Sequence, residues 1–266
     1  PRGAAGIASY PVPPTAERLE LVTRDGVRLA GYLVPAREPS RGLLLGFAGN
    51  AWNGDDFTAF LAHRVKDHDI VVFHYRGYAP SEGRPSEAAL FEDALLIYDR
   101  MAERLRPTRV VGAGFSLGSG VAAYLARHRR VDGLLLVTPF ASLEAVARER
   151  YPWLPVRALI RHAFRSDTYL RDLDVPAAVI MAGDDRVIPK THGEALVQVL
   201  TRPVMVETVP GATHNGLYDE EAFDLLLERA LRALAEAGRG RLPERSRAED
   251  GVAPDAAGDG SAFEAA

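Results

Sequence analysis

The sequence predicts an α/β fold with a mostly parallel, doubly wound sheet and helices on both faces. Three observations support this fold class. Short apolar runs of strand length recur along the chain, and amphipathic stretches of helical length separate them. No repeat with a period of about 20 to 50 residues is visible, which argues against a solenoid. Strands that alternate with helices in this way indicate βαβ units, whose parallel strands are covered on both sides.

The first elements predict an antiparallel edge. Asp25-Gly26 lies between the strand candidates Leu19–Thr23 and Val27–Val34, and this dipeptide is a strong hairpin signal. Gly42–Phe47 follows as a continuous apolar run, as expected for a strand that is buried on both faces. The hairpin therefore precedes the parallel part of the sheet.

The remaining elements alternate along the chain. The further apolar runs are expected to form strands at Ile70–His74, Arg109–Phe115, Gly133–Val137, Ala177–Ala182 and Val204–Val209. The amphipathic stretches are expected to form helices at Asp55–Lys66, Ser86–Leu105, Leu117–Arg129, Pro189–Leu200 and Asp219–Ala237. One connection breaks this rhythm, because residues 139–174 place about 36 residues between two strands. Connections of this length are usually functional, so we expect an inserted lid.

The composition divides the chain into a folded domain and two simple ends. Residues 1–14 are rich in Gly, Ala and Pro and are expected to form a flexible leader. Residues 15–237 are expected to form the domain. Residues 238–266 hold few large apolar groups, so burial cannot offset their ordering entropy and a disordered tail is expected.

Charge and residue usage exclude several classes of protein. The 266 residues carry a formal net charge of −4 without a basic stripe in the folded part, so we expect no nucleic-acid partner. The absence of cysteine excludes a disulfide framework, a thiolate metal site and a cysteine nucleophile. No apolar run reaches the length of a transmembrane helix. A cytoplasmic location is expected. Pro1 is not an initiator methionine, so the question whether an export signal or anchor precedes it stays open.

The strongest chemical signal is Gly114-Phe115-Ser116-Leu117-Gly118, which ends a predicted strand and opens a predicted helix. This is the setting of a serine nucleophile on a sharp turn, where the flanking residues must be small. The turn would expose the Ser116 hydroxyl above the sheet, and the helix N-terminus would favour developing negative charge. Glycines that merely allow a tight turn are the simpler alternative.

A serine nucleophile needs a base, and the base needs an orienting acid. Two aspartates, Asp184 and Asp185, follow the strand at Ala177–Ala182, and His214 follows the next strand. Both loops lie at the carboxyl ends of strands, where ligands bind in open α/β sheets. The order serine, acid, histidine indicates a catalytic triad.

Two backbone N–H groups are candidates for an oxyanion hole. Leu117 follows the nucleophile directly, and Asn50 lies in the loop after Gly42–Phe47, beside Gly49. A simple Gly-Asn turn is the alternative interpretation of that loop.

The other histidines carry weaker signals. His63, His68 and His128 lie on or beside predicted helices and His192 opens another, so we interpret them as surface residues. His162 lies in the predicted lid. No His-Glu-x-x-His run and no phosphate-binding loop with its lysine is present, so we expect neither a metal nor a cofactor.

Together these motifs resemble those of α/β-hydrolase-domain serine hydrolases of the lysophospholipase and serine-aminopeptidase branch. The resemblance is greatest to the group that contains membrane-associated depalmitoylating thioesterases. It covers roughly residues 19–234 and rests on the serine motif, the acid loop and the runs Ala48–Ala51, Tyr75–Gly83 and Gly211–His214. The chain departs from the family pattern where Ala48 replaces a histidine and His74 replaces an aspartate, and its acid loop is one residue shorter than usual.

The resemblance implies roles for individual residues. In the family the acid precedes a helix-starting proline, and the spacing to Pro189 favours Asp185 over Asp184. Arg76 is expected to tie loops together. The implied reaction is cleavage of a carboxylic ester or thioester through an acyl-enzyme on Ser116. The substrate is a small molecule, and an apolar acyl chain could contact Trp153 and Phe164 of the lid, unless these aromatics form the lid's own small core.

Two alternatives differ in class. An aminopeptidase or amidase would use the same triad. Acidic lid residues that bind a free amine would favour this alternative, but arginine dominates the lid. A non-catalytic relative would bind a small molecule or a protein on the same fold. An intact triad argues against that second alternative.

Overall fold

Strands and helices alternate through residues 10–50, 52–155 and 162–239, which the computed structural model describes. The strands are β1 (Glu17–Val22), β2 (Arg28–Val34), β3 (Leu43–Phe47), β4 (Asp69–Phe73), β5 (Val110–Phe115), β6 (Gly133–Val137), β7 (Ala177–Ala182) and β8 (Pro203–Val209). The helices are α1 (Gly54–Arg64), α2 (Glu87–Leu105), α3 (Leu117–His128), α4 (Leu143–Arg150), α6 (Ser166–Leu170), α7 (Lys190–Val197), α8 (Glu221–Arg239) and the short 3-10 helix η1 (Gly216–Asp219).

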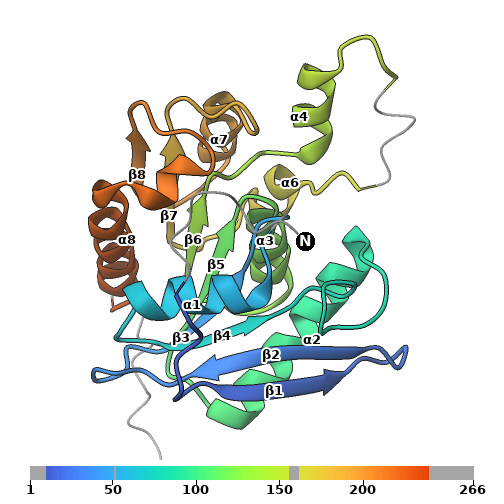
Figure 1. The fold of residues 1–266 in the computed structure, drawn as a ribbon. Coiled ribbons are helices and arrows are strands. Elements are labelled where there is room, and N and C mark those ends of the chain that lie inside the picture. The colour runs from blue at the N-terminus through green and yellow to red at the C-terminus, as the bar shows by residue number, and fades with distance from the viewer. Residues whose placement is uncertain (1–9, 51, 156–161, 240–266) are drawn as a thin grey trace, which may run out of the picture.

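The eight strands form one sheet in the order β1-β2-β4-β3-β5-β6-β7-β8 (Figure 1). β2 is antiparallel to both neighbours, and the other neighbouring pairs are parallel. This confirms the predicted fold class, with the hairpin at one edge. Because β5, β6, β7 and β8 are adjacent and parallel, the loops that follow them meet at one edge of the sheet.

Local capping explains why the start of α1 differs from its predicted position. β6 and β7 have the predicted bounds, whereas α1 begins one residue early, at Gly54. Asn53 caps this helix by accepting a hydrogen bond from Asp56 N at 2.8 Å. The helix ends at Arg64 because Val65 already has extended backbone angles.

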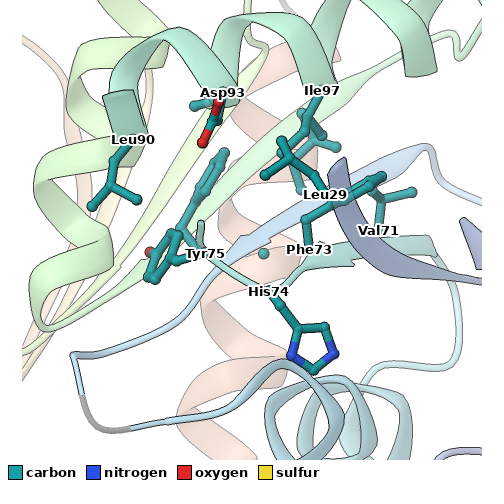
Figure 2. Close-up of a pocket in the computed structure, with 12 residues that line it drawn as sticks. Leu29, Val71, Phe73, His74, Tyr75, Leu90, Asp93 and Ile97 are labelled. Carbon is teal, nitrogen blue, oxygen red and sulfur yellow. The ribbon is translucent and has the colours of Figure 1, made fainter. Parts of the chain in front are cut away.

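The space between α2 and the sheet is almost filled. Figure 2 shows a cavity there, between side chains such as Leu29, Phe73 and Ile97. Its volume of about 10 Å³ would hold one water molecule at most. It contains none of the predicted site residues, so it is a packing void in the core.

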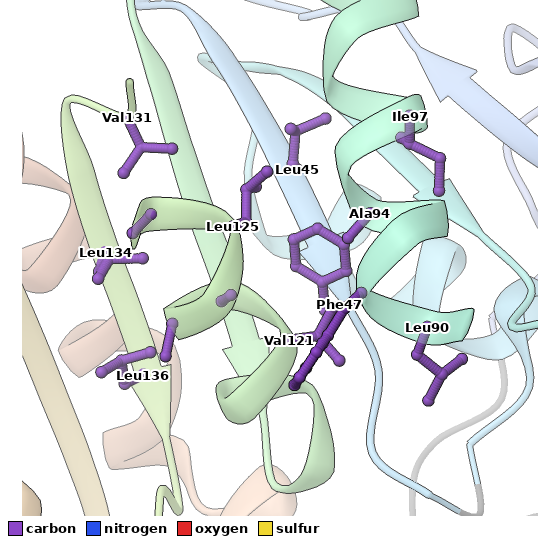
Figure 3. Packing of buried hydrophobic residues seen from close by; sticks show 14 of the residues in the cluster. Leu45, Phe47, Leu90, Ala94, Ile97, Val121, Leu125, Val131, Leu134 and Leu136 are labelled. Atoms are coloured by element: carbon purple, nitrogen blue, oxygen red, sulfur yellow. The ribbon is translucent and has the colours of Figure 1, made fainter. Parts of the chain in front are cut away.

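Alternating side chains of the central strands supply two cores, one on each face of the sheet. On β6, Leu134 and Leu136 pack with the apolar residues of α2 and α3 (Figure 3). Leu135 and Val137, from the same strand, pack with α1 and α8 on the other face. Burial of each such side chain stabilises the fold by about 1.5–3 kcal/mol. The central strands therefore cannot shift register without exposing both cores.

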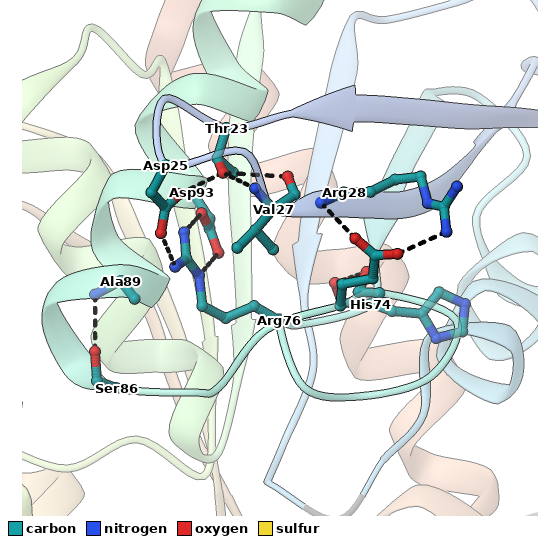
Figure 4. A network of polar contacts seen from close by, with 11 residues as sticks. Thr23, Asp25, Val27, Arg28, His74, Arg76, Ser86, Ala89 and Asp93 are labelled. Atoms are coloured by element: carbon teal, nitrogen blue, oxygen red, sulfur yellow. Dashed lines mark hydrogen bonds and ion pairs between the residues drawn. The ribbon is translucent and has the colours of Figure 1, made fainter.

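A buried ion pair fixes the loop after β4 to the hairpin and to α2. Arg76 donates through Nε and Nη2 to the two carboxylate oxygens of Asp93, at 2.8 and 2.6 Å. Its Nη1 donates to Asp25, in the β1–β2 turn, at 2.9 Å (Figure 4). The hydrogen bonds from Arg76 to Asp93 raise the pKa of the guanidinium above its usual range. Arg76 therefore ties these loops together, as expected.

The predicted leader and tail lie mostly outside the described residues. Residues 1–9 and 240–266 are not described. Of the leader, Tyr10 stacks on His63 of α1 with ring centroids 3.9 Å apart. At the other end, α8 continues to Arg239, two residues beyond the predicted domain boundary. Within the described residues no helix is long and apolar enough to cross a bilayer.

Replacing Arg76 by alanine should lower the free energy of unfolding by about 3–5 kcal/mol, because Asp93 would be left buried without its partner. Urea denaturation measures this change. Arg28→Ala is the control, because Arg28 pairs with Glu82 at an exposed position and its loss should cost about 1 kcal/mol or less. Equal losses in the two variants would contradict a buried role for Arg76.

Candidate active site

Ser116 lies on the sharp turn between β5 and α3 in a backbone conformation that is rare for a residue with a side chain. Its φ is 51° and its ψ is −118°, which costs on the order of 1–3 kcal/mol. Its backbone N–H donates to Val137 O at 2.9 Å, which holds the turn on β6. Ser116 occupies the N-cap position of α3, but its side chain makes no capping hydrogen bond. The hydroxyl is therefore available for another partner.

The turn requires glycine on both sides of the serine. A Cβ on Gly114 would lie 2.6 Å from Ser119 Cα. A Cβ on Gly118 would lie 2.7 Å from the carbonyl oxygen of Ala48 and closer still to that of Phe47. Real side chains do not tolerate such contacts with backbone atoms. Gly114 is thus needed for the close approach of β5 to the first turn of α3, and Gly118 for the close approach of α3 to the end of β3.

His214 joins Ser116 to Asp185. Its Nε2 lies 3.0 Å from Ser116 Oγ, and its Nδ1 lies 2.6 Å from Asp185 Oδ2. An ionised carboxylate only accepts hydrogen bonds, so Nδ1 carries the proton and Nε2 is left to accept from the serine hydroxyl. The side chains of Asp185 and His214 are 1% and 10% exposed, so little water competes for these bonds.

The acid loop holds Asp185 rigidly and leaves Asp184 outside the site. Asp185 Oδ1 accepts hydrogen bonds from the backbone N–H groups of Val187 and Ile188, both at 2.8 Å. Asp184 is exposed, and its backbone N–H donates to Ala212 O at 2.9 Å. Of the two candidate acids, the structure therefore brings Asp185 to His214.

The loop that carries Asn50 lies against the serine. A Cβ on Gly49 would be 3.5 Å from Ser116 Cβ, so the backbone of this loop passes directly beside Ser116. Leu117, as the first residue of α3, has an N–H that no helical carbonyl can reach. Ala51 lies outside the described residues. The two predicted oxyanion donors thus belong to neighbouring segments.

Two tyrosines brace this loop, a role that sequence reasoning missed. Tyr75 donates through its hydroxyl to Ala48 O at 2.9 Å. Tyr78 donates to Asn50 O at 2.5 Å and lies 3.1 Å from Asn50 Oδ1. Burial raises the pKa of both tyrosine hydroxyls, so they remain protonated donors. The sequence signal that could have revealed this bracing role is the presence of both tyrosines in the Tyr75–Gly83 run.

A third tyrosine, Tyr218, lies buried in η1. Burial raises the pKa of its hydroxyl, and the charge of Asp185 adds to the rise. The Tyr218 hydroxyl lies 3.5 Å from Thr138 Oγ1. The sequence offered no motif that distinguishes this tyrosine from an ordinary core residue.

Two histidines that we interpreted as surface residues are buried. His68 is 3% exposed and lies 2.7 Å from Asp67 Oδ1. His192 is 7% exposed, and its Nε2 lies 2.8 Å from Glu149 Oε2 on α4. The interpretation failed because it used position along the chain, whereas the burial of His68 before β4 and of His192 against α4 is set by tertiary contacts. His63 and His128 are exposed, as expected.

The predicted lid region contains α4 and α6, and residues 156–161 within it are not described. Its second end is fastened to α2, because the carboxylate of Glu87 accepts hydrogen bonds from Ala163 N and Phe164 N at 2.8 and 2.9 Å. Phe164 is 3% exposed and packs against Phe91, with ring centroids 5.3 Å apart. Phe164 is therefore a core residue, whereas Trp153 is exposed.

The sequence of this chain is similar to those of several known proteins. A family model described as alpha/beta hydrolase fold matches residues 43–168. The alpha/beta hydrolase domain-containing protein 17B of Xenopus laevis is 30% identical over 219 residues, which cover 80% of this chain and 73% of that protein. The lysophosphatidylserine lipase ABHD12 of Danio rerio is 28% identical over 194 residues, which cover 62% of this chain and 51% of the lipase.

Solved structures show the same fold. A hydrolase from Pseudomonas aeruginosa superposes with a TM-score of 0.63 at 23% sequence identity, over 81% of this chain and 98% of that chain. At this identity the likeness concerns the fold alone.

The geometry predicts which aspartate activates the serine. Asp185→Asn should slow the reaction of Ser116 with a fluorophosphonate probe by about 10⁴-fold, because an amide would favour the wrong imidazole tautomer. The rate of probe labelling, followed by in-gel fluorescence, measures this. Asp184→Asn is the matched control and should leave the rate within about twofold of wild type.

Ser116→Ala should abolish labelling. Equal labelling of that variant, or a larger effect of Asp184→Asn than of Asp185→Asn, would contradict this assignment of the two side chains.

Proposed function

The chain belongs to the α/β hydrolase family, and we propose that it is a serine hydrolase that cleaves carboxylic esters or thioesters through an acyl-enzyme on Ser116. The observation that carries the proposal is the continuous hydrogen-bonded chain from Ser116 Oγ through His214 to Asp185. Each member sits at the carboxyl end of a different strand, β5, β8 and β7. Such a chain is the arrangement that turns a serine hydroxyl into a nucleophile.

In the first half of the reaction, Ser116 Oγ attacks the carbonyl carbon while His214 Nε2 takes the hydroxyl proton. Asp185 stabilises the resulting imidazolium, with its second oxygen held by two backbone N–H groups. The N–H groups of Leu117 and Asn50 stabilise the oxyanion. The tetrahedral intermediate collapses, the alcohol or thiol leaves with the proton from His214, and the acyl group remains on Ser116.

In the second half, a water molecule replaces the leaving group. His214 takes a proton from this water as it attacks the acyl-enzyme carbonyl. The second tetrahedral intermediate releases the carboxylic acid, and His214 returns the proton to Ser116. No metal or cofactor takes part in these steps.

Ester or thioester cleavage has more support than amide cleavage. The relative ABHD12 bears the name lysophosphatidylserine lipase, and a lysophospholipid is an ester. An aminopeptidase would need carboxylates that bind the free amine, but four arginines offset the five carboxylates in the described part of the lid. Of its acidic residues, Glu149 lies against His192 and Asp167 against Arg165.

Wild-type protein should hydrolyse p-nitrophenyl esters, and Ser116→Ala should lower kcat by about 10⁶-fold, as expected when a triad serine is lost. Absorbance of p-nitrophenolate, measured over a series from acetate to long-chain esters, reports the preferred acyl length. Thioesters of the same acyl groups test whether a thiol also serves as the leaving group. Faster cleavage of matched p-nitroanilides would favour the amidase alternative, and no turnover of any substrate would favour a non-catalytic binding protein.

Tyr78→Phe should lower kcat about tenfold with little change in KM, because the loop that presents Asn50 loses its brace and an oxyanion donor moves. Steady-state kinetics on the best ester measures both constants. Tyr98→Phe is the matched control, because it removes a tyrosine hydroxyl that donates to Arg130 O away from the site. A rise in KM alone, or equal effects in both variants, would contradict a role in oxyanion stabilisation.

A further inference from the structure

The large apolar side chains that are exposed are not scattered evenly. Within the described residues they are Val22, Tyr151, Trp153, Leu154, Val187, Val206 and Leu225. Four of these seven lie on two segments, the loop after α4 and the acid loop after β7. Trp153 is 74% exposed, the largest fraction among them. Clusters of exposed apolar groups mark surfaces that bind a membrane, a protein or a ligand.

The two segments form one continuous surface. Arg150 Nη1 donates to the carbonyl oxygen of Arg186 at 3.1 Å, which joins the end of α4 to the acid loop. A groove between them is lined by Val146, Glu149, Arg150, Arg186, Val187 and Pro189. We call residues 148–154 together with Arg186 and Val187 the cap face. In Figure 1, α4 and the loop after it stand away from the sheet, at the upper right.

The cap face combines its apolar groups with positive charge. Arg148, Arg150 and Arg186 are all exposed there. Two carboxylates oppose them: Glu149, which lies 2.8 Å from His192, and the exposed Asp184. Three arginines against two carboxylates leave a net positive charge around the aromatic side chains.

We propose that the cap face binds an anionic lipid surface. Trp and Tyr favour the boundary between headgroups and acyl chains, where an apolar ring and a polar edge are both accommodated. Tyr151 and Trp153 pack edge to face, with ring centroids 5.8 Å apart, so they present one joint aromatic tip. Each arginine beside such a tip raises the affinity for anionic headgroups by about fivefold.

This binding mode has a consequence for the site. Val187 belongs to the cap face, and its backbone N–H donates to the carboxylate of Asp185. A lipid surface at the cap face therefore lies beside the acid loop, so an ester could pass from the bilayer to the site. The lipid contact itself requires no catalysis and is tested without substrate.

The chain carries its own probe for this contact. It has two tryptophans, of which Trp52 is 6% exposed and Trp153 is 74% exposed. Vesicles of phosphatidylcholine with phosphatidylglycerol should shift the fluorescence of Trp153 to shorter wavelength, and vesicles of phosphatidylcholine alone should do so less. Salt should weaken the effect by screening. A Trp52→Phe variant isolates the Trp153 signal.

Co-sedimentation with the anionic vesicles measures the partition coefficient. Trp153→Ala should lower it by at least about tenfold, which corresponds to loss of one buried aromatic ring, and Arg148→Gln by about fivefold. Leu225→Ala, at an exposed position on α8, is the matched control and should stay within about twofold of wild type. Circular dichroism confirms that each variant is folded.

Three results would overturn the proposal: no binding of wild type to anionic vesicles, equal binding of Trp153→Ala, or a fluorescence shift that depends on protein concentration in the absence of lipid. The last result would show that a second copy of the chain covers the cap face.

Discussion

The close approach of α3 to the end of β3 is the constraint on which the site depends. Gly118 lies so near the carbonyl groups of Phe47 and Ala48 that no side chain fits between them. This contact forces the sharp turn in which Ser116 adopts a positive φ, and it sets the Gly49 backbone beside the serine. The strain at one residue is tolerated because two buried cores hold β3 and β5 in fixed register. Ser116 and the loop that carries Asn50 therefore form one rigid unit.

The rest of the chain brings His214 and Asp185 to that unit. Because β7 and β8 are neighbours in the sheet, their following loops deliver Asp185 and His214 side by side. Two backbone N–H groups hold Asp185, and Asp185 in turn fixes the imidazole of His214. The side chains between the sheet and Ser116 Oγ are therefore held in place by hydrogen bonds. The predicted lid, residues 139–174, contributes differently. Glu87 fastens one end of it to α2, while its exposed aromatic tip stands away from the sheet.

Patterns that arise from short-range physics could be predicted from the sequence. The alternation of apolar runs indicated the sheet, and the glycines around Ser116 indicated the sharp turn. Side-chain partners set by tertiary contact could not be predicted in this way. The bracing of Asn50 by Tyr78 joins residues that are 28 positions apart, and the burial of His192 depends on how α7 packs against α4. The same limit applies to Phe164. An aromatic residue at this position could line a pocket or pack in the core, and only the tertiary contacts show that it lies in the core.

The central claim is that an acyl group passes through Ser116. Intact-protein mass spectrometry after rapid acid quench of a reaction with a p-nitrophenyl ester tests it most directly. The account predicts a mass increase equal to the acyl group, which peptide mapping places on the segment that contains Ser116 and which disappears as the ester is consumed. Sustained hydrolysis without any adduct, or an adduct on a different residue that decays at the rate of turnover, would contradict it.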